Sequence, residues 1–359
     1  MTKTLNPLLF DRTLTGRIRK LFDKELSSRF DALKKSIVEL IVDEDVFGLN
    51  LPKLNIMTSG VLARNTIWRF LTDDQKLEEF KRWVRSQVDI TVLGSDVFVG
   101  GALSEDHYVY EYISRAFSEG IERAFISMRT VDYAEKLDFI DMTKEQFLRS
   151  VFARPVSFER VKLLASRVFA DLKNVTEDMA TKMQRVLTDG FIRGESPWTI
   201  ARSMIKEIDI SKQRAKRIAR TEIIRAHNEG QLDGLESLGV EDVGVAVEWV
   251  VSGLCTTARG YPSPCPLCKP LAGMVLTIRE ARGMLPRHPN CMCSWVPANV
   301  GEDHRGQLRT RGRIMSAISK SIKAEMSRKN KRLSLKEQKK LSRWIGAEVR
   351  VSKKRPKGI

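Results

Sequence analysis

Soft metal ligands gather in one short stretch of the chain. Cys265 and Cys268 form a C-x2-C pair, and after nineteen further residues His288, Cys291 and Cys293 form an H-x2-C-x-C group. Two sets of closely spaced ligands, each on a short turn, allow a tetrahedral Zn2+ ion to close the loop between them. The spacing therefore predicts a structural zinc site.

Five candidate ligands exceed the four that a structural zinc ion takes. We expect one of Cys291 and Cys293 to be spare, because the C-x2-C spacing favours Cys265 and Cys268 as a knuckle pair. Disulfides or plain buried cysteines are the alternatives. The sequence lacks secretory features, which indicates a reducing compartment where cysteines bind metal more readily than they pair. Cys255, ten residues before this cluster, is expected to be a free thiol.

A second group of polar residues lies on a predicted helix over residues 211–238. Arg217, Thr221, Arg225 and Asn228 are spaced by three and four residues, so they share one helical face. We expect polar groups here to lock the helix to the module that follows it. A catalytic site and a charge-patterned surface helix are the alternatives. The expected cluster consists of Arg220, Thr221, Glu222, Arg225 and Asn228.

The basic charge of the chain is concentrated in its last part. The net charge is +17, but residues 301–359 hold 19 Lys/Arg and 5 Asp/Glu, whereas the other 300 residues hold 43 and 40. Trp344 is the only aromatic residue of this tail, so the tail is predicted to neutralise phosphates rather than to stack on bases. A solvated tail without a specific partner is the alternative. The expected nucleic-acid contacts are Arg328, Lys329, Lys331, Arg332, Lys339, Lys340, Lys353, Lys354 and Arg355.

Helical periodicity dominates the sequence before residue 240. Apolar residues at spacings of three and four predict helices over 12–46, 73–88, 107–130, 157–172, 176–193, 197–208 and 211–238. Alternating valines predict a strand over about 243–251. The residues expected to cap these helices are Asp73 or Asp74, Asn174 or Thr176, and Ser211.

These patterns predict a mainly α protein in four parts. A helical N-terminal domain (1–155) precedes a helical core (156–239), a small zinc-pinned α+β module (240–300) and a basic tail (301–359) that is helical or partly disordered. The pattern leaves open whether the N-terminal domain packs on the core. No window holds eighteen uncharged apolar residues, so we expect no membrane segment and a cytoplasmic site of synthesis.

Several separated motifs carry a family resemblance over residues from about 160 to 300. In sequence order they are Ala219-Arg220-Thr221-Glu222, Asn228, Gln231-Leu232-Asp233, Glu248-Trp249, the C-P-L-C block and the R-H-P-N-C-x-C block. Together they resemble the head-morphogenesis domain of the phage Mu F-like minor head proteins. Two departures are visible: Met292 stands where a basic residue is common, and Cys255 lies in a loop that is often shorter and acidic.

The resemblance implies a minor capsid component of a tailed phage rather than an enzyme. Its implied partners are the portal protein and the major capsid or scaffold proteins, and the basic tail predicts a non-specific contact with packaged DNA. It would be assembled in the host cytoplasm and remain in the virion, in the capsid interior or at the portal vertex, with a role in assembly or DNA delivery. The family's metal-like ligands fall on Cys265, Cys268, His288, Cys291 and Cys293, with Zn2+ as the expected structural ion.

Two catalytic alternatives remain open. His227 and Glu229, together with Pro264-Cys265 and Cys268, satisfy the H-x-E and P-C-x-x-C pattern of zinc-dependent nucleic-acid deaminases. That hypothesis makes His227 a zinc ligand and gives His288 no role. A metal-dependent nuclease is the other alternative, suggested by His288-Pro289-Asn290, although the chain has only four histidines.

Overall fold

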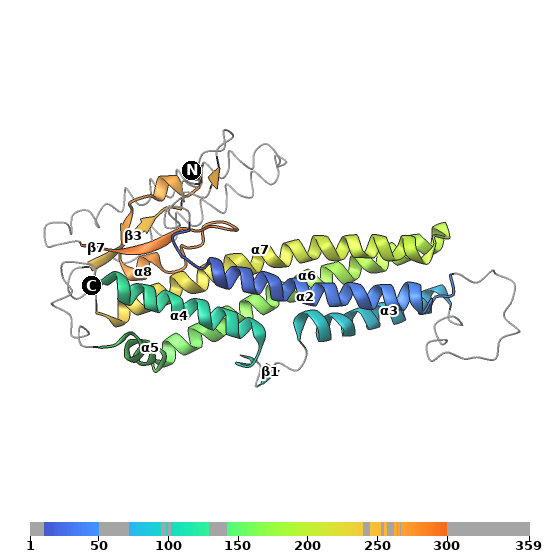
Figure 1. Cartoon of the computed structure of the whole chain (residues 1–359), viewed down its shortest axis with the longest axis horizontal. Coiled ribbons are helices and arrows are strands. Elements are labelled where there is room, and N and C mark those ends of the chain that lie inside the picture. Colours follow the sequence, from blue (N-terminus) through green and yellow to red (C-terminus); the bar gives the residue numbers. More distant parts are fainter. Residues whose placement is uncertain are drawn as a thin grey trace, which may run out of the picture.

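Long helices form a rod with a small mixed module against one side (Figure 1). The computed structural model describes residues 11–49, 72–94, 98–99, 102–128, 142–239, 245–252, 255–256, 262–263, 265 and 267–299. Within these residues the chain is mainly helical with a small strand region, as the sequence predicts.

Two helices of about forty residues form the backbone of the rod. α6 (Pro155–Arg193) and α7 (Pro197–Ser237) are joined by a tight turn. Gly194 ends α6 with a φ of 65°, a left-handed conformation that glycine adopts without the usual steric cost. Ser196 then caps α7 by accepting a hydrogen bond from the backbone of Thr199, and Pro197 occupies the first helical position.

Three further helices pack on this hairpin. α2 (Gly16–Val38) and α4 (Tyr108–Met128) lie against α7, and α3 (Asp73–Val88) lies against α6. The short α5 (Lys144–Phe152) packs near α4. The remaining pieces of this region are the π-helical turns η1 (Glu39–Asp43) and η3 (Asp89–Leu93) and the paired strands β1 (Phe98–Val99) and β2 (Ala102–Leu103).

Helices on both sides of Pro155 share one hydrophobic core. Phe22, Phe117 and Phe169 belong to the same cluster of buried residues, although they come from α2, α4 and α6. The N-terminal helices therefore pack on the core, a point that the sequence left open. The four-part division of the chain stays a prediction.

The module is built on a three-stranded antiparallel sheet in the order β6-β3-β7. Its strands are β3 (Val245–Val250), β6 (Val275–Leu276) and β7 (Ser294–Asn299). Trp249 and Trp295 are opposite each other in the register, fully buried, and meet edge to face with ring centroids 5.3 Å apart. The smaller elements are β4 (Cys255–Thr256), β5 (Pro262–Ser263), the 3-10 turn η5 (Lys269–Leu271) and α8 (Ile278–Ala281).

The structure corrects several predicted helix ends. The expected breaks within 157–193 and 197–238 are wrong, because α6 and α7 are each continuous. Thr176 does not cap a helix: it is buried and its hydroxyl donates to the Lys173 carbonyl 2.8 Å away, a bond that a helix interior accommodates. Ser211 is likewise buried inside α7.

Two other ends differ from the prediction. α3 is capped by Thr72 rather than by Asp73 or Asp74, through a reciprocal capping box with Gln75. The first helix begins at Gly16 and passes into a π-helical turn after Val38. In the part of the chain that the structure describes, no helix has the length and apolar character needed to cross a bilayer.

Candidate metal centre

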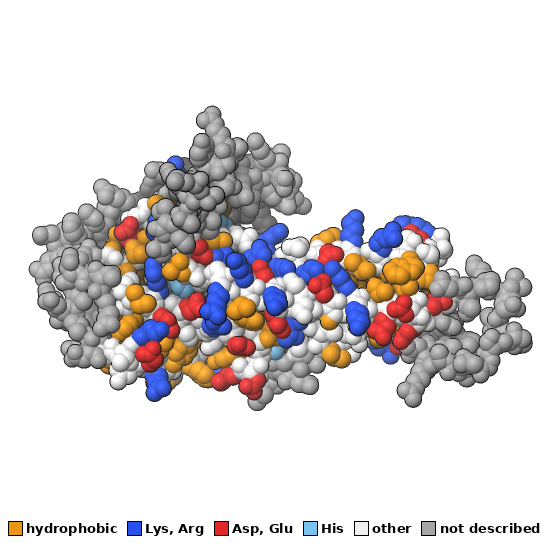
Figure 2. Space-filling view, in the orientation of Figure 1, with side chains coloured by type: hydrophobic (Ala, Val, Ile, Leu, Met, Phe, Trp, Pro, Cys, Tyr) orange, Lys and Arg blue, Asp and Glu red, His pale blue; other side chains and the backbone are white. Residues whose placement is uncertain are grey.

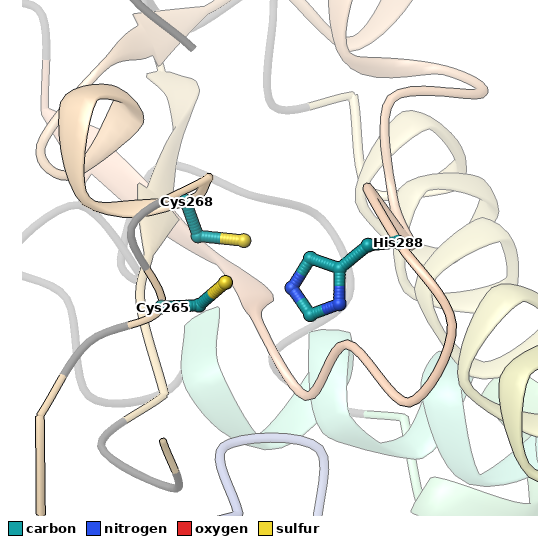
Figure 3. A group of neighbouring side chains, drawn as sticks. All are labelled: Cys265, Cys268 and His288. Carbon is teal, nitrogen blue, oxygen red and sulfur yellow. The ribbon is translucent and has the colours of Figure 1, made fainter. Parts of the chain in front are cut away.

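Two short turns hold the ligands of the module in place. After Cys265, the backbone N–H groups of Cys268 and Lys269 both donate to the Cys265 carbonyl, at 3.0 and 2.8 Å. In the second turn the Cys291 N–H donates to the His288 carbonyl at 3.0 Å, and Asn290 adopts a left-handed φ of 59°. Each turn points its ligands toward the other, so that Cys265, Cys268 and His288 converge (Figure 3).

The ligand atoms form two groups that share one sulfur. Cys265, Cys268 and His288 make one group and Cys268, Cys291 and Cys293 make the other, with all ligand atoms of a group within 4.8 Å of one another. The Sγ atoms of Cys268 and Cys291 are 3.8 Å apart. Sulfurs about 2.3 Å from a tetrahedral zinc ion lie about 3.8 Å from each other, so this spacing fits joint ligation.

The histidine is oriented as a ligand. The Nδ1 atom of His288 faces the Pro289 carbonyl at 2.9 Å, which favours a proton on Nδ1 and leaves the lone pair on Nε2. That Nε2 atom is buried and makes no hydrogen bond to nitrogen or oxygen within the described residues. A metal ion would satisfy a buried ring nitrogen that faces two cysteine sulfurs.

The electrostatics of the cluster also favour a cation. The hydrogen bond from Cys268, followed by His288, lowers the pKa of Cys265 to about 3, and a hydrogen bond from Cys268 also lowers the pKa of Cys291. Burial alone would lower the pKa of His288, but the sulfurs of Cys265 and Cys291 raise it to about 10. The pKa of Cys268 is raised by its hydrogen bonds to those two thiolates. A metal ion would replace these shared protons and allow every ligand to coordinate.

Four of the five ligands form a closed ring of neighbours. Cys265 adjoins Cys268, Cys268 adjoins Cys291, and His288 interacts with both Cys265 and Cys291. Cys293 adjoins only Cys268 and Cys291 of this set. The five residues that could hold an ion are therefore all brought together.

Polar side chains on α7 fix the module to the bundle. The Gln231 amide, which is fully buried, donates to the Trp295 carbonyl at 2.7 Å and accepts from the Ser294 hydroxyl at 3.0 Å. Asn228 donates to the Cys293 carbonyl at 3.3 Å, and Thr221 accepts from the Asn290 backbone at 3.1 Å. The start of β7 and the second ligand turn are thus hydrogen-bonded to one helix.

The rest of the predicted polar cluster contacts other helices. The Arg220 guanidinium is ion-paired with Asp23 on α2, with Nε 2.6 Å from the carboxylate. Glu222 is buried and receives Arg225 at 2.9 Å and Arg167 of α6 at 3.7 Å. Of the five residues predicted to lock the helix to the module, Thr221 and Asn228 contact it directly.

The family comparison agrees with this geometry. Residues 181–296 match the family model described as phage Mu protein F like protein. We call residues 181–296 the Mu F-like region because of this similarity. The match begins within α6, includes all of α7 and ends inside β7 after both ligand turns. Neither the search of curated proteins nor that of solved structures found a match.

A second group of ion pairs, which the sequence did not predict, also fixes the module to α7 in the Mu F-like region. Arg282, just after α8, pairs with Asp233 at 2.8 Å and with Glu229 at 3.4 Å. Arg160 of α6 pairs with the same Asp233, and Glu229 also accepts from the Gly283 backbone at 2.8 Å. Asp233 and Gln231 belong to the motif that carried the resemblance, which was the only signal in the sequence that pointed to them.

Other predicted site residues lie away from the cluster or outside the described part of the chain. His227 belongs to neither metal-ligating group within the described residues, so the ligand set of the deaminase hypothesis is not assembled there. His227 is 1 % exposed and its backbone lies against Gly120 of α4. The nucleic-acid contacts predicted in the tail, from Arg328 to Arg355, lie outside the described residues, as does the side chain of Cys255.

The buried His227 predicts an acid-sensitive stability. Burial lowers its pKa from 6.5 to about 4, so the unfolded chain binds a proton before the folded chain does. The contribution is complete above pH 6.5 and is lost as the pH falls toward 4; at pH 5 the loss is about 2 kcal/mol. We expect His227→Gln to remove this part of the difference between unfolding free energies at pH 7 and pH 5, measured by urea denaturation. An identical pH dependence of the unfolding free energy in both proteins would contradict the prediction. The metal cluster titrates in both proteins, so its contribution cancels when the two are compared.

Proposed function

We propose that this chain is a minor head protein of a tailed phage that acts in head morphogenesis. The observation that carries the proposal is the Mu F-like match over residues 181–296, which contains both ligand turns and the polar contacts to α7. Its partners are the portal protein and the major capsid or scaffold proteins, and its place is the portal vertex or the inner capsid wall.

The metal centre has a structural role in this proposal, and its ion is Zn2+. A set of three cysteines and one histidine is a donor set that zinc takes in closed structural sites. Cys265, Cys268, His288 and Cys291 would hold the ion, and Asn228, Gln231 and Thr221 hold the ligand turn in place on α7. Four protein ligands leave no position for a substrate, so we propose a protein without enzymatic activity.

The tail supplies a non-specific DNA contact in the same proposal. Its excess of Lys and Arg would neutralise phosphates without reading the sequence, so the affinity would fall steeply with salt. Such a contact suits a protein that lies beside packaged DNA during assembly or delivery.

The test is the composition of particles made by the phage that encodes this chain. We expect mass spectrometry of purified procapsids and virions to find the chain in both, in few copies relative to the major capsid protein. Chemical crosslinking of procapsids is expected to join the helical rod to the portal protein. Particles that lack the chain at both stages would contradict the proposal, whatever the metal content of the purified protein.

A further inference from the structure

Residues 1–300 hold nearly equal numbers of Lys/Arg and Asp/Glu, but two neighbouring helix segments within them hold an excess of Lys/Arg. α2 contains seven Lys/Arg and three Asp/Glu, and α7 from residue 197 to 220 contains seven and two. By contrast, α3 has four of each and α4 has two Lys/Arg and three Asp/Glu. α5 has two Lys/Arg and one Asp/Glu, and α6 has seven and five, so the largest excess of positive charge in the described helices lies on α2 and the adjacent first half of α7.

α2 and α7 run antiparallel with their charges in register. Asp23 pairs with Arg220, Lys34 with Asp209 at 2.5 Å, and Lys212 with Asp31 at 2.9 Å. Lys212 also reaches Asp209 at 3.1 Å. The hydrogen bond that Asp31 receives from Lys212, followed by the one from Lys34, lowers the pKa of Asp31. The carboxylates at the seam are thus already neutralised by cations of the seam itself.

The cations that remain have no such partner. Besides Arg17 near the start of α2, seven Lys and Arg side chains of these two helices make no ion pair within the described part of the protein; six of the seven are exposed and one is half-buried. We call this set the α2–α7 basic face. It consists of Lys20, Lys24, Lys35, Arg202, Lys206, Lys216 and Arg217.

The basic face has the shape of a long strip. Figure 2 shows Lys and Arg side chains distributed along the rod where α2 and α7 lie in Figure 1. From Arg202 to the level of Lys20 the strip covers roughly 30 Å of helix axis at 1.5 Å per residue. That length is close to one turn of duplex DNA, about 34 Å.

We propose that the α2–α7 basic face binds the phosphate backbone of duplex DNA. A protein partner would be expected to bury an apolar centre. The large exposed hydrophobic side chains of these two helix segments are Leu21, Ile210 and Trp198, which are 37 %, 48 % and 57 % exposed, and they are separated along the strip rather than gathered in one patch. Uncompensated cations on a rigid strip suit phosphates, which fix position and carry no sequence information. This contact deepens the proposed role beside packaged DNA and does not depend on the tail.

The experiment measures binding of the full-length protein to a fluorescent 30-base-pair duplex over a series of salt concentrations. The face variant carries Lys20→Gln, Lys24→Gln, Lys216→Gln and Arg217→Gln. The control variant removes four exposed cations that lie off the face and have the same lack of ion pairs: Arg85→Gln, Arg149→Gln, Lys269→Gln and Arg279→Gln. Thermal unfolding of both variants checks that each is folded.

We expect the face variant to lower the slope of log K against log salt by about 3 to 4, at about 0.9 per lost phosphate contact. The control variant has the same net charge and is expected to change the slope by less than about 1. A third full-length protein, with Lys353, Lys354 and Arg355 replaced by Gln, should respond to the face substitutions by the same amount, which separates the face from the tail.

Two results would overturn the inference. Equal losses in the face and control variants would mean that net charge alone sets the affinity. An unchanged DNA slope, with lost capture of the portal protein by the face variant, would assign the strip to an acidic protein instead. Either result leaves the particle composition test unaffected, so this inference and the proposed function can fail separately.

Discussion

Cys268→Ser is expected to abolish metal binding and to unfold the module while the helical rod remains. Cys268 is the one ligand shared by both groups, and its sulfur lies 3.8 Å from that of Cys291. Structural zinc contributes about 10 kcal/mol or more to the folding of small domains, which exceeds what a module of this size can supply from its core. Elemental analysis should fall from one zinc per chain to nearly none. Hydrogen exchange should rise over residues 267–299 and stay low in α6 and α7.

The matched control is Cys293→Ser. Cys293 is also buried, but it is grouped with neither Cys265 nor His288, so we expect one zinc per chain to remain. His288→Ala should lose the metal, and His227→Gln should keep it. Loss of zinc with Cys293 and its retention with His288 would show that four cysteines form the site. Loss with His227 alone would restore the deaminase hypothesis.

The ligands of this site could be predicted from the sequence because their geometry is local. A C-x2-C turn and an H-x2-C turn bring their side chains together within four residues, and short-range spacing determines that result. The identity of the spare ligand could not be predicted. It depends on how the two ligand turns are placed relative to each other. Asn228 and Gln231 of α7 determine the position of the second turn through their hydrogen bonds to the backbone of Cys293 and Trp295.

The continuity of the two long helices could not be predicted from the sequence. Residues such as Thr176 and Ser211 favour caps, and local preference alone therefore predicts breaks in α6 and α7. In the structure both are buried against neighbouring helices, and a continuous apolar face keeps each helix intact. The α2–α7 basic face could not be predicted from the sequence for a related reason. A net charge counts residues, whereas the pairing of Asp31 and Asp209 with Lys34 and Lys212 requires α2 and α7 to be placed side by side.

Gly120→Ala is expected to destabilise the protein by about 3 to 5 kcal/mol, although alanine normally favours a helix over glycine by about 1 kcal/mol. Gly120 of α4 faces α7 so closely that an added Cβ would lie 2.0 Å from the His227 carbonyl oxygen. Gly230 of α7 makes the reciprocal approach, 2.1 Å from the Phe117 carbonyl oxygen. Both obstacles are backbone atoms, so no rotamer change can relieve them and the helices must separate.

Gly16→Ala is the control for that substitution. Gly16 is also helical, but an added Cβ would meet only side-chain ends 3.8 Å away, so the unfolding free energy should rise by about 0.4 to 1 kcal/mol. Urea denaturation of the two variants gives the comparison. Separation of α4 from α7 should also disturb the module, because Asn228 and Gln231 hold β7 from the same stretch of α7. Near-equal stabilities of the two variants would mean that α4 and α7 do not cross at glycine contact distance.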